Sequence, residues 1–172
     1  MKTSFLLIFI VLTLISTQLV SGKCTRPIYS QDINETLRLC GENFGIKNGL
    51  IVSKDNIDID CSSAVLQGNL FGKATGFLIE DRKNVTLHDC RIVNYDVGIV
   101  IRNSSNIVFD KITLLRNRAG IKLFNSFNVS ITNSFDISLE KPLLVSNSSG
   151  NIFSYFNKKI KGDFCSYNFC GK

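Results

Sequence analysis

The chain has few residues of the kinds that bind transition metals. It contains one histidine, His88, no Cys-x-x-Cys pair, and no methionine besides Met1. Copper would therefore find only thiols as soft ligands, and the sequence predicts no metal site. Helical periodicity is also missing after residue 40, so helices are not expected to connect the other elements. No aromatic and basic residues combine into a recognition motif, which argues against nucleic acid as a partner.

Only one segment is apolar enough to approach a membrane span. Lys2 precedes an apolar run over residues 5–15, and small residues at 20–22 provide a cleavage site before Lys23. This pattern predicts a secretory signal peptide over residues 1–22 and a secreted protein, extracellular or periplasmic. The alternative is an uncleaved anchor, since a span takes roughly 20 apolar residues. Polar residues at 13 and 16–18 weaken that alternative, under which the membrane would be a partner.

The six cysteines all follow the predicted cleavage site, on the export side, where disulfides persist. Their order along the chain suggests local pairs, but the sequence does not choose among the many connectivities. The disulfide candidates are Cys24, Cys40, Cys61, Cys90, Cys165 and Cys170.

The net charge of +6 comes partly from a basic run at residues 158–161. Such a run could contact anionic glycans or phospholipid. A short run of this kind more often keeps a surface solvated, and we favour that interpretation.

A repeat of about 22 residues dominates the sequence after position 48, a length typical of stacked repeat architectures. Gly76, Gly98, Gly120 and Pro142 follow one another at a constant spacing, and each opens a short apolar phrase. A second phrase begins at asparagines of nearly the same spacing, Asn84, Asn106, Asn128 and, one position late, Asn151. Gly49 and Asn56 start the two series, each at a longer interval before its next copy. Within each phrase apolar residues alternate with others, which is the period of a β-strand.

Repeats of this length predict a stack of coils whose strands pair in parallel with their equivalents above and below. We therefore expect an all-β, single-stranded parallel β-helix of about five coils. Residues 23–48 would form an N-terminal cap, 49–155 the repeats and 156–172 a C-terminal cap closed by its two cysteines. The inward positions expected on the first two walls are Phe77/Ile79, Ile99/Ile101, Ile121/Leu123, Leu143/Val145, Val85/Leu87, Ile107/Phe109, Val129/Ile131 and Ile152.

The third wall is less regular. The inward positions there are Cys90/Ile92, Ile112/Leu114 and the poorer pair Ser134/Asp136; a slip of one residue, to Phe135 and Ile137, would restore the apolar pattern.

Asparagines recur at the corners between strands, both in the series above and at Asn103, Asn125 and Asn147. Asparagine tolerates left-handed backbone, and its amide both donates and accepts, so stacked asparagines can form hydrogen-bonded ladders. Most of the five glycosylation sequons fall on ladder positions. Corners favour asparagine, serine and threonine in any case, so these sequons need no attached sugar to explain them. Asn34 lies outside the ladder and is the glycosylation candidate.

The opening of the chain resembles that of secreted right-handed β-helix proteins of the NosD-like, pectate-lyase-superfold group. The matching elements are Cys24, Ile-Asn-Glu-Thr-Leu at 33–37, Cys40, Gly-Leu-Ile-Val at 49–52 and Asn-Ile-Asp-Ile-Asp-Cys at 56–61. Later coils look like that group's carbohydrate-binding and sugar-hydrolase repeats, over about residues 24–155. The resemblance implies right-handed coiling. It is a poor guide to function, because this superfold hosts lyases, hydrolases, adhesins and accessory proteins.

One corner carries acids that the repeat does not require. Asp60, His88 and Asp110 each follow a corner asparagine by four residues, with Asp89 and Arg91 nearby. Stacked acids could bind calcium, and lyases of the superfold pair such a site with a basic residue. The competing interpretation, which we favour, is that these are solvated corner residues, since Thr132 and Ser154 break the column.

Outward apolar residues form a second non-repeat feature. Leu78, Val100 and Leu144, with Val108 and Phe153 on the next wall, form an expected exposed stripe that a protein partner or the C-terminal tail would cover. The sequence thus favours a secreted, non-enzymatic module that binds a carbohydrate, an envelope component or a protein. The alternatives are a small polysaccharide lyase or hydrolase using Asp60, Asp89 and Asp110, and a NosD-like accessory protein that handles metal.

Overall fold

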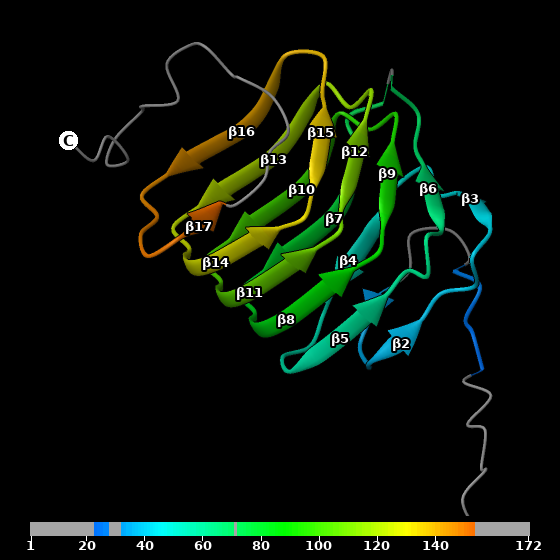
Figure 1. Cartoon of the computed structure of the whole chain (residues 1–172), viewed down its shortest axis with the longest axis horizontal. Helices are drawn as coiled ribbons and strands as arrows, with labels where there is room; N and C mark the ends of the chain where they lie inside the picture. The colour runs from blue at the N-terminus through cyan, green and yellow to red at the C-terminus, as the bar shows by residue number, and fades with distance from the viewer. Residues whose placement is uncertain (1–22, 28–31, 71, 154–172) are drawn as a thin grey trace, which may run out of the picture.

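The computed structural model describes residues 23–27, 32–70 and 72–153. Over these residues the chain is all-β and winds through six coils of up to three short strands each (Figure 1). The expectation of an all-β parallel β-helix is confirmed, with six coils rather than five. Residues 32–45, which the sequence assigned to the N-terminal cap, add a strand to the end of each sheet.

Equivalent strands of successive coils form three parallel sheets. The first sheet contains β1 (Asp32–Ile33), β4 (Leu50–Val52), β7 (Thr75–Glu80), β10 (Val97–Arg102), β13 (Ala119–Phe124) and β16 (Lys141–Ser146). The second contains β2 (Leu37–Arg38), β5 (Ile57–Asp60), β8 (Lys83–His88), β11 (Ser105–Asp110), β14 (Phe127–Thr132) and β17 (Ile152–Phe153). The third contains β3 (Asn43–Gly45), β6 (Val65–Gln67), β9 (Arg91–Val93), β12 (Thr113–Leu115) and β15 (Phe135–Ile137).

The register of the sheets follows the spacing of the sequence repeat. Ile99 pairs with Phe77 on one side and Ile121 on the other, and all three are buried. Ile107 stands in the same way between Val85 and Val129. Burial of these stacked columns supplies the main stabilising force, because no single coil can cover its own apolar face.

The last coil departs from the expected register on the second wall. Ile152, expected inside, pairs with the outward Ser130 and is 59% exposed. Phe153, expected outside, pairs with Ile131 and packs against the core. The reason is that the coil keeps its 22-residue spacing, with Gly150 at a φ of +66° in the corner position equivalent to Asn128, so Asn151 and the residues after it lie one position further along the strand than the asparagine phrase suggested. A shift of one residue exchanges the two faces of a strand.

The third wall keeps the Ser134/Asp136 positions, and the alternative slip of one residue does not occur. Asp136 pairs with Leu114 and takes the inward position, while Ile137 is 55% exposed. The corner before β15 fixes this register, since Ser134 Oγ accepts a hydrogen bond from the Ile112 amide and the Phe135 amide donates to the Ile112 carbonyl. A slip of one residue would break both bonds.

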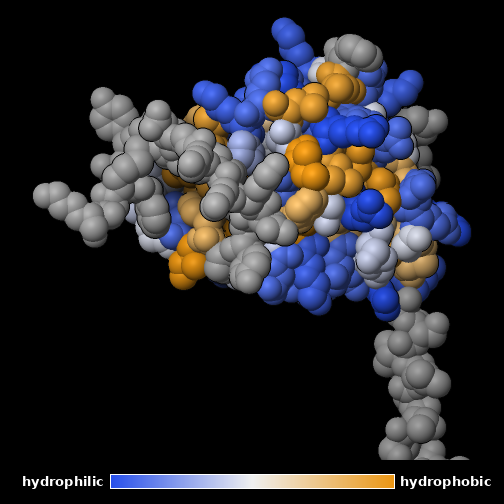
Figure 2. Space-filling model, turned by 45° about the horizontal axis from the view of Figure 1, so that its top comes forward, coloured by the Kyte–Doolittle hydropathy of each residue, from blue (hydrophilic) through white to orange (hydrophobic). Residues whose placement is uncertain are grey.

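The outward stripe is also less exposed than expected. Val100 is only 4% exposed and packs with Val97, Ala119 and Leu78 in a small second cluster. Apolar residues do gather in a patch bordered by hydrophilic ones on the face shown in Figure 2. The exposed large apolar side chains of the described residues are Ile51, Val108, Phe127, Ile137, Leu139 and Ile152.

The asparagine ladder is present. Nδ2 of Asn84, Asn106 and Asn128 each donates to Oδ1 of the previous asparagine, starting at Asn56, with lengths of 2.6–2.9 Å. All four have left-handed φ angles of 55–57°. Asn151 leaves the ladder, and its Oδ1 instead accepts from the Val129 amide. Asn34 is exposed, as a glycosylation site requires.

Among the described residues no helix is long and apolar enough to cross a membrane. The predicted signal peptide (1–22), the predicted C-terminal cap (156–172), its cysteines Cys165 and Cys170, and the basic run lie outside the described residues.

Candidate functional site

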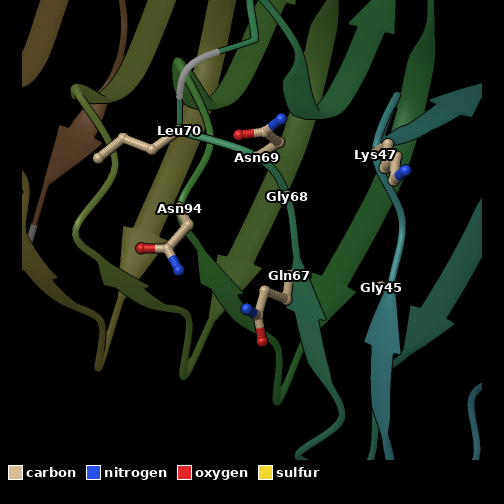
Figure 3. A pocket seen from close by; sticks show the side chains of 7 residues that line it. All are labelled: Gly45, Lys47, Gln67, Gly68, Asn69, Leu70 and Asn94. Atoms are coloured by element: carbon tan, nitrogen blue, oxygen red, sulfur yellow. The ribbon is translucent and has the colours of Figure 1, made fainter.

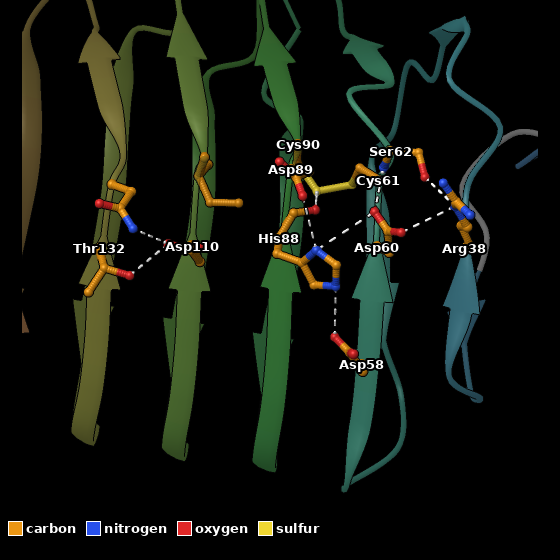
Figure 4. Close-up of polar contacts among 12 residues, drawn as sticks. Arg38, Asp58, Asp60, Cys61, Ser62, His88, Asp89, Cys90, Asp110 and Thr132 are labelled. Carbon is orange, nitrogen blue, oxygen red and sulfur yellow. Dashed lines mark hydrogen bonds and ion pairs between the residues drawn. A yellow bond between two sulfur atoms is a disulfide. The ribbon is translucent and has the colours of Figure 1, made fainter.

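The structure stacks the predicted acids at the corner between the second and third sheets. His88 pairs with Asp60 on one side and Asp110 on the other, so the three side chains occupy equivalent positions at the ends of β5, β8 and β11 (Figure 4). Asp89 follows His88 with a left-handed φ of 55°. We call Asp58, Asp60, His88 and Asp89 the acid corner.

The imidazole of His88 is the centre of the acid corner. Its Nδ1 lies 3.3 Å from Asp89 Oδ2 and 3.7 Å from Asp60 Oδ1. Its Nε2 lies 3.3 Å from Asp58 Oδ1. Three carboxylates thus approach one imidazole, and one ligand atom each from Asp60, His88 and Asp89 can be chosen so that all lie within 4.8 Å of one another.

Asp110 does not join this group. Its Oδ1 accepts hydrogen bonds from Asn133 Nδ2 at 2.7 Å and Thr132 Oγ1 at 3.0 Å. The Asn133 bond is the main reason why the pKa of Asp110 is lowered, with Thr132 and nearby positive charge adding to it. Arg91 is exposed on β9, and the ion pairs that link the described residues of the corner do not include it. Two of the three candidate aspartates, Asp60 and Asp89, therefore converge, without Asp110 and without the candidate Arg91.

Sequence reasoning missed two residues of this region. Asp58 lies two positions before Asp60 on the same face of β5. Arg38 pairs with Asp60 in the parallel register, and its Nε lies 3.2 Å from Asp60 Oδ2 and 2.6 Å from Ser62 Oγ. The signal was available, because Arg38 precedes Asp60 by one repeat length in the sequence.

Four of the predicted disulfide cysteines are paired. Cys61 and Cys90 form a buried disulfide beside the acid corner, directly after Asp60 and Asp89 respectively. Cys24 and Cys40 form a second disulfide near the start of the stack. The bridge between Cys61 and Cys90 joins neighbouring coils and so fixes the distance between the two aspartates.

A second concave feature lies at the other end of the third sheet. Seven residues, 68–74, join β6 to β7, whereas three residues make the same corner in the next two coils, 94–96 and 116–118. This longer loop borders a pocket of about 490 Å³ (Figure 3). We call it the loop pocket; its lining residues are Gly45, Lys47, Gln67, Gly68, Asn69, Leu70 and Asn94.

The ring of Tyr95 packs against the longer loop at Gly68. Its ring is fully buried, and its hydroxyl donates to the Ile46 carbonyl at 2.8 Å, next to Lys47. A Cβ on Gly68 would collide with the ring, so only glycine fits where the loop crosses Tyr95. Burial also raises the pKa of the Tyr95 hydroxyl, which keeps it a neutral donor. The long first interval of the repeat, between Gly49 and Gly76, was the sequence signal for the loop.

The two features suit different chemistry. The acid corner offers one imidazole nitrogen and several carboxylate oxygens, a donor set for a cation. The described lining of the loop pocket offers three amide side chains and one ammonium group but no carboxylate. Amides both donate and accept hydrogen bonds, as the hydroxyl groups of a sugar require.

Comparison with protein families agrees with the fold. A family model described as "right handed beta helix region" matches residues 42–167. A search of curated proteins found no match. Among solved structures, the enzymatically active domain of tailspike protein 2 from bacteriophage CBA120 is similar, with 14% identity and a TM-score of 0.29 over 76% of this chain.

This chain spans only 26% of the tailspike domain, and a likeness at that level assigns no activity. The family model, by contrast, covers well over half of the sequence and agrees with the stacked parallel sheets. The chain therefore belongs to the family of right-handed β-helix proteins.

Proposed function

We propose that this protein is an exported β-helix module that binds a carbohydrate in the loop pocket without catalysing a reaction on it. One observation carries the proposal. The longest corner loop of the described coils builds a concave surface whose described lining has amides and a lysine, with no carboxylate that could act as an acid or base. In repeat folds, insertions of this kind gather on one face, which is often the binding face.

The chemistry of the lining supports a sugar ligand. Gln67 and Lys47 are exposed, and Asn94 from the coil after Gln67 lines the same pocket (Figure 3). Lys47 would favour a glycan that carries a carboxylate, while the amides would bind hydroxyl groups. The two disulfides and the β-helix fold are consistent with an extracellular protein.

Binding can be tested by titrating neutral and uronate-containing oligosaccharides into the labelled protein and following amide shifts by NMR. We expect shifts that map to residues 45–47, 67–70 and 94. Gln67→Ala should weaken binding of both glycan classes by about tenfold, and Lys47→Ala should weaken the uronate class selectively, since each removes one or two hydrogen bonds.

Asn43→Ala is the matched control, because Asn43 is an exposed amide on the same sheet outside the pocket. Equal losses in the Asn43 and Gln67 variants, or the absence of any glycan-induced shift, would contradict the proposal.

The alternative function is catalysis by the acid corner. It is supported by the closeness of Asp60 and Asp89, whose carboxylate oxygens can contact the same bound ligand. Incubation with polyuronates in the presence of calcium separates the two functions. Release of unsaturated uronides or new reducing ends, lost in Asp89→Asn, would establish the enzyme instead.

A further inference from the structure

The acid corner has more hydrogen-bond acceptors than its imidazole has donors. Asp58, Asp60 and Asp89 approach the two ring nitrogens of His88 at 3.3–3.7 Å. A neutral imidazole carries a single N–H. If Nε2–H donates to Asp58, the lone pair of Nδ1 faces Asp60 and Asp89, and these three atoms repel one another unless a cation lies among them.

A proton on Nδ1 of His88 would provide a hydrogen bond to only one of the two carboxylates that face it. A protonated Nδ1 can donate to Asp89 Oδ2 at 3.3 Å, but Asp60 Oδ1 at 3.7 Å is beyond hydrogen-bond distance. A metal ion can contact both carboxylates and the ring nitrogen together.

We propose that the acid corner binds a zinc-type divalent cation through Nδ1 of His88, Oδ1 of Asp60 and Oδ2 of Asp89. Zinc bonds to nitrogen and oxygen of about 2.0–2.1 Å place neighbouring tetrahedral ligands about 3.3–3.4 Å apart. The observed distances from Nδ1 of His88 to Asp89 Oδ2 and Asp60 Oδ1, 3.3 Å and 3.7 Å, are close to that ligand–ligand separation. Small side-chain movements would complete the three-ligand set.

Asp58 fits the role of the outer carboxylate. A histidine that binds metal through one nitrogen commonly donates its other N–H to a carboxylate, which fixes the tautomer and the ring orientation. Asp58 Oδ1 lies 3.3 Å from Nε2, on the side of the ring away from Asp60 and Asp89 (Figure 4). Asp58 therefore favours the tautomer with the proton on Nε2, which leaves Nδ1 available to bind a metal ion.

The other ligands are held before any metal binds. Arg38 contacts Oδ2 of Asp60, and the Ser62 amide donates to Oδ1 at 2.7 Å. The disulfide between Cys61 and Cys90 fixes the adjacent backbone of both coils. The side chains of Asp60, His88 and Asp89 are 27%, 27% and 36% exposed, so an ion can enter and a water can complete the coordination.

The donor set favours zinc over calcium. Calcium takes six to eight oxygens, whereas this corner offers two carboxylates and an imidazole, a ligand suited to zinc and its transition-metal neighbours. One histidine was too few for a metal motif in the sequence, and the parallel register supplies the missing ligands from the preceding coil.

The test uses the full chain, with its disulfides intact, after chelator treatment. Competition against a chromophoric zinc indicator should show a single saturable site, and Co²⁺ should give the intense visible absorption of a four-coordinate ion. His88→Gln and Asp89→Asn should each lower zinc affinity by more than about tenfold, and Asp58→Asn by about tenfold.

Asp110→Asn is the matched control, because Asp110 lies in the same column but is bound to Asn133 and Thr132. It should leave zinc affinity unchanged. Zinc binding that persists in His88→Gln and Asp89→Asn, calcium that displaces zinc at equal concentration, or no binding above that of the unfolded chain would each overturn the proposal.

Discussion

Asp136 is a charged residue in a column that apolar side chains occupy elsewhere. It continues the inward positions of Ile92 and Leu114. Its Oδ2 is buried with no hydrogen-bond partner among the described residues, and burial raises its pKa to about 6. A Cβ on Gly120 would collide with this carboxylate, so the glycine provides the space that Asp136 needs. The ionised form is therefore disfavoured in the folded state.

We expect this carboxyl to make the protein less stable as the pH rises. Its folded pKa of about 6 exceeds the ordinary 3.8, so the folded state holds the proton more tightly than the unfolded state. Stability from this group is complete below about pH 4 and is lost as the pH rises through about 6. Asp136→Asn should abolish that slope and raise the free energy of unfolding at pH 7 by about 1–3 kcal/mol.

Urea unfolding of both proteins between pH 4 and pH 8 measures this effect. An unchanged pH slope in the Asn variant would show that Asp136 is not the group responsible. Asp110→Asn is the control: hydrogen bonds lower the pKa of Asp110, so its stabilisation is lost only as the pH falls below about 4, and this variant should keep the slope of the parent protein between pH 4 and pH 8.

At the scale of the elements, the corners specify the register as much as the strands do. Asn106 stands in the middle of the ladder, donating to Asn84 at 2.9 Å and accepting from Asn128 at 2.6 Å. Its φ of 56° is a backbone conformation that asparagine and glycine adopt more readily than other residues. The residue thus satisfies the conformation and the hydrogen bonds of the corner together.

Two substitutions at Asn106 separate these contributions. Asn106→Gly keeps the left-handed backbone but loses both ladder bonds, and should lower the free energy of unfolding by about 1–2 kcal/mol. Asn106→Ala loses the bonds and adds strain, and should cost about 1–2 kcal/mol more. Thermal or urea unfolding measures both. An alanine variant as stable as the glycine variant would contradict the role of the backbone conformation.

The elements that follow the repeat could be predicted from the sequence, and those that depart from it could not. The positions of Ile99 and Ile107 follow from alternation and spacing alone. Phe153 was placed on the wrong face because the prediction followed the asparagine phrase at Asn151, whereas the structure keeps the 22-residue spacing and puts Gly150 at the corner. The register at Asp136 stayed open between two alternatives, because the apolar pattern favoured a slip and the sequence does not show the hydrogen bonds of Ser134 that oppose it. Of the candidate site, the stacking of Asp60 and His88 was predictable, but side-chain directions, which separate Asp110 from them, were not.

At the scale of the whole molecule, stability is approximately a sum over neighbouring coils, because each strand of such a stack pairs only with those beside it. The hydrogen bond from Tyr95 to the Ile46 carbonyl, which reaches past one coil, is an addition to that sum. Covalent links between neighbours therefore matter more than in a globular core. The bridge between Cys61 and Cys90 joins two successive coils within the core. The bridge between Cys24 and Cys40 lies at the first coil, with Cys24 exposed.

Removal of the two disulfides should have different effects on stability. Cys61→Ala with Cys90→Ala opens a loop with a sequence separation of 29 and should lower the free energy of unfolding by about 3–4 kcal/mol. Cys24→Ala with Cys40→Ala should instead release mainly the first coil, since a terminal repeat has one neighbour. Hydrogen exchange resolved by residue distinguishes these outcomes. In the first variant we expect loss of protection in β5, β6, β8 and β9, and in the second only in β1 to β3. Equal loss across all coils in both variants would show that the stack unfolds as one unit, in which case stability could not be assigned to neighbouring pairs.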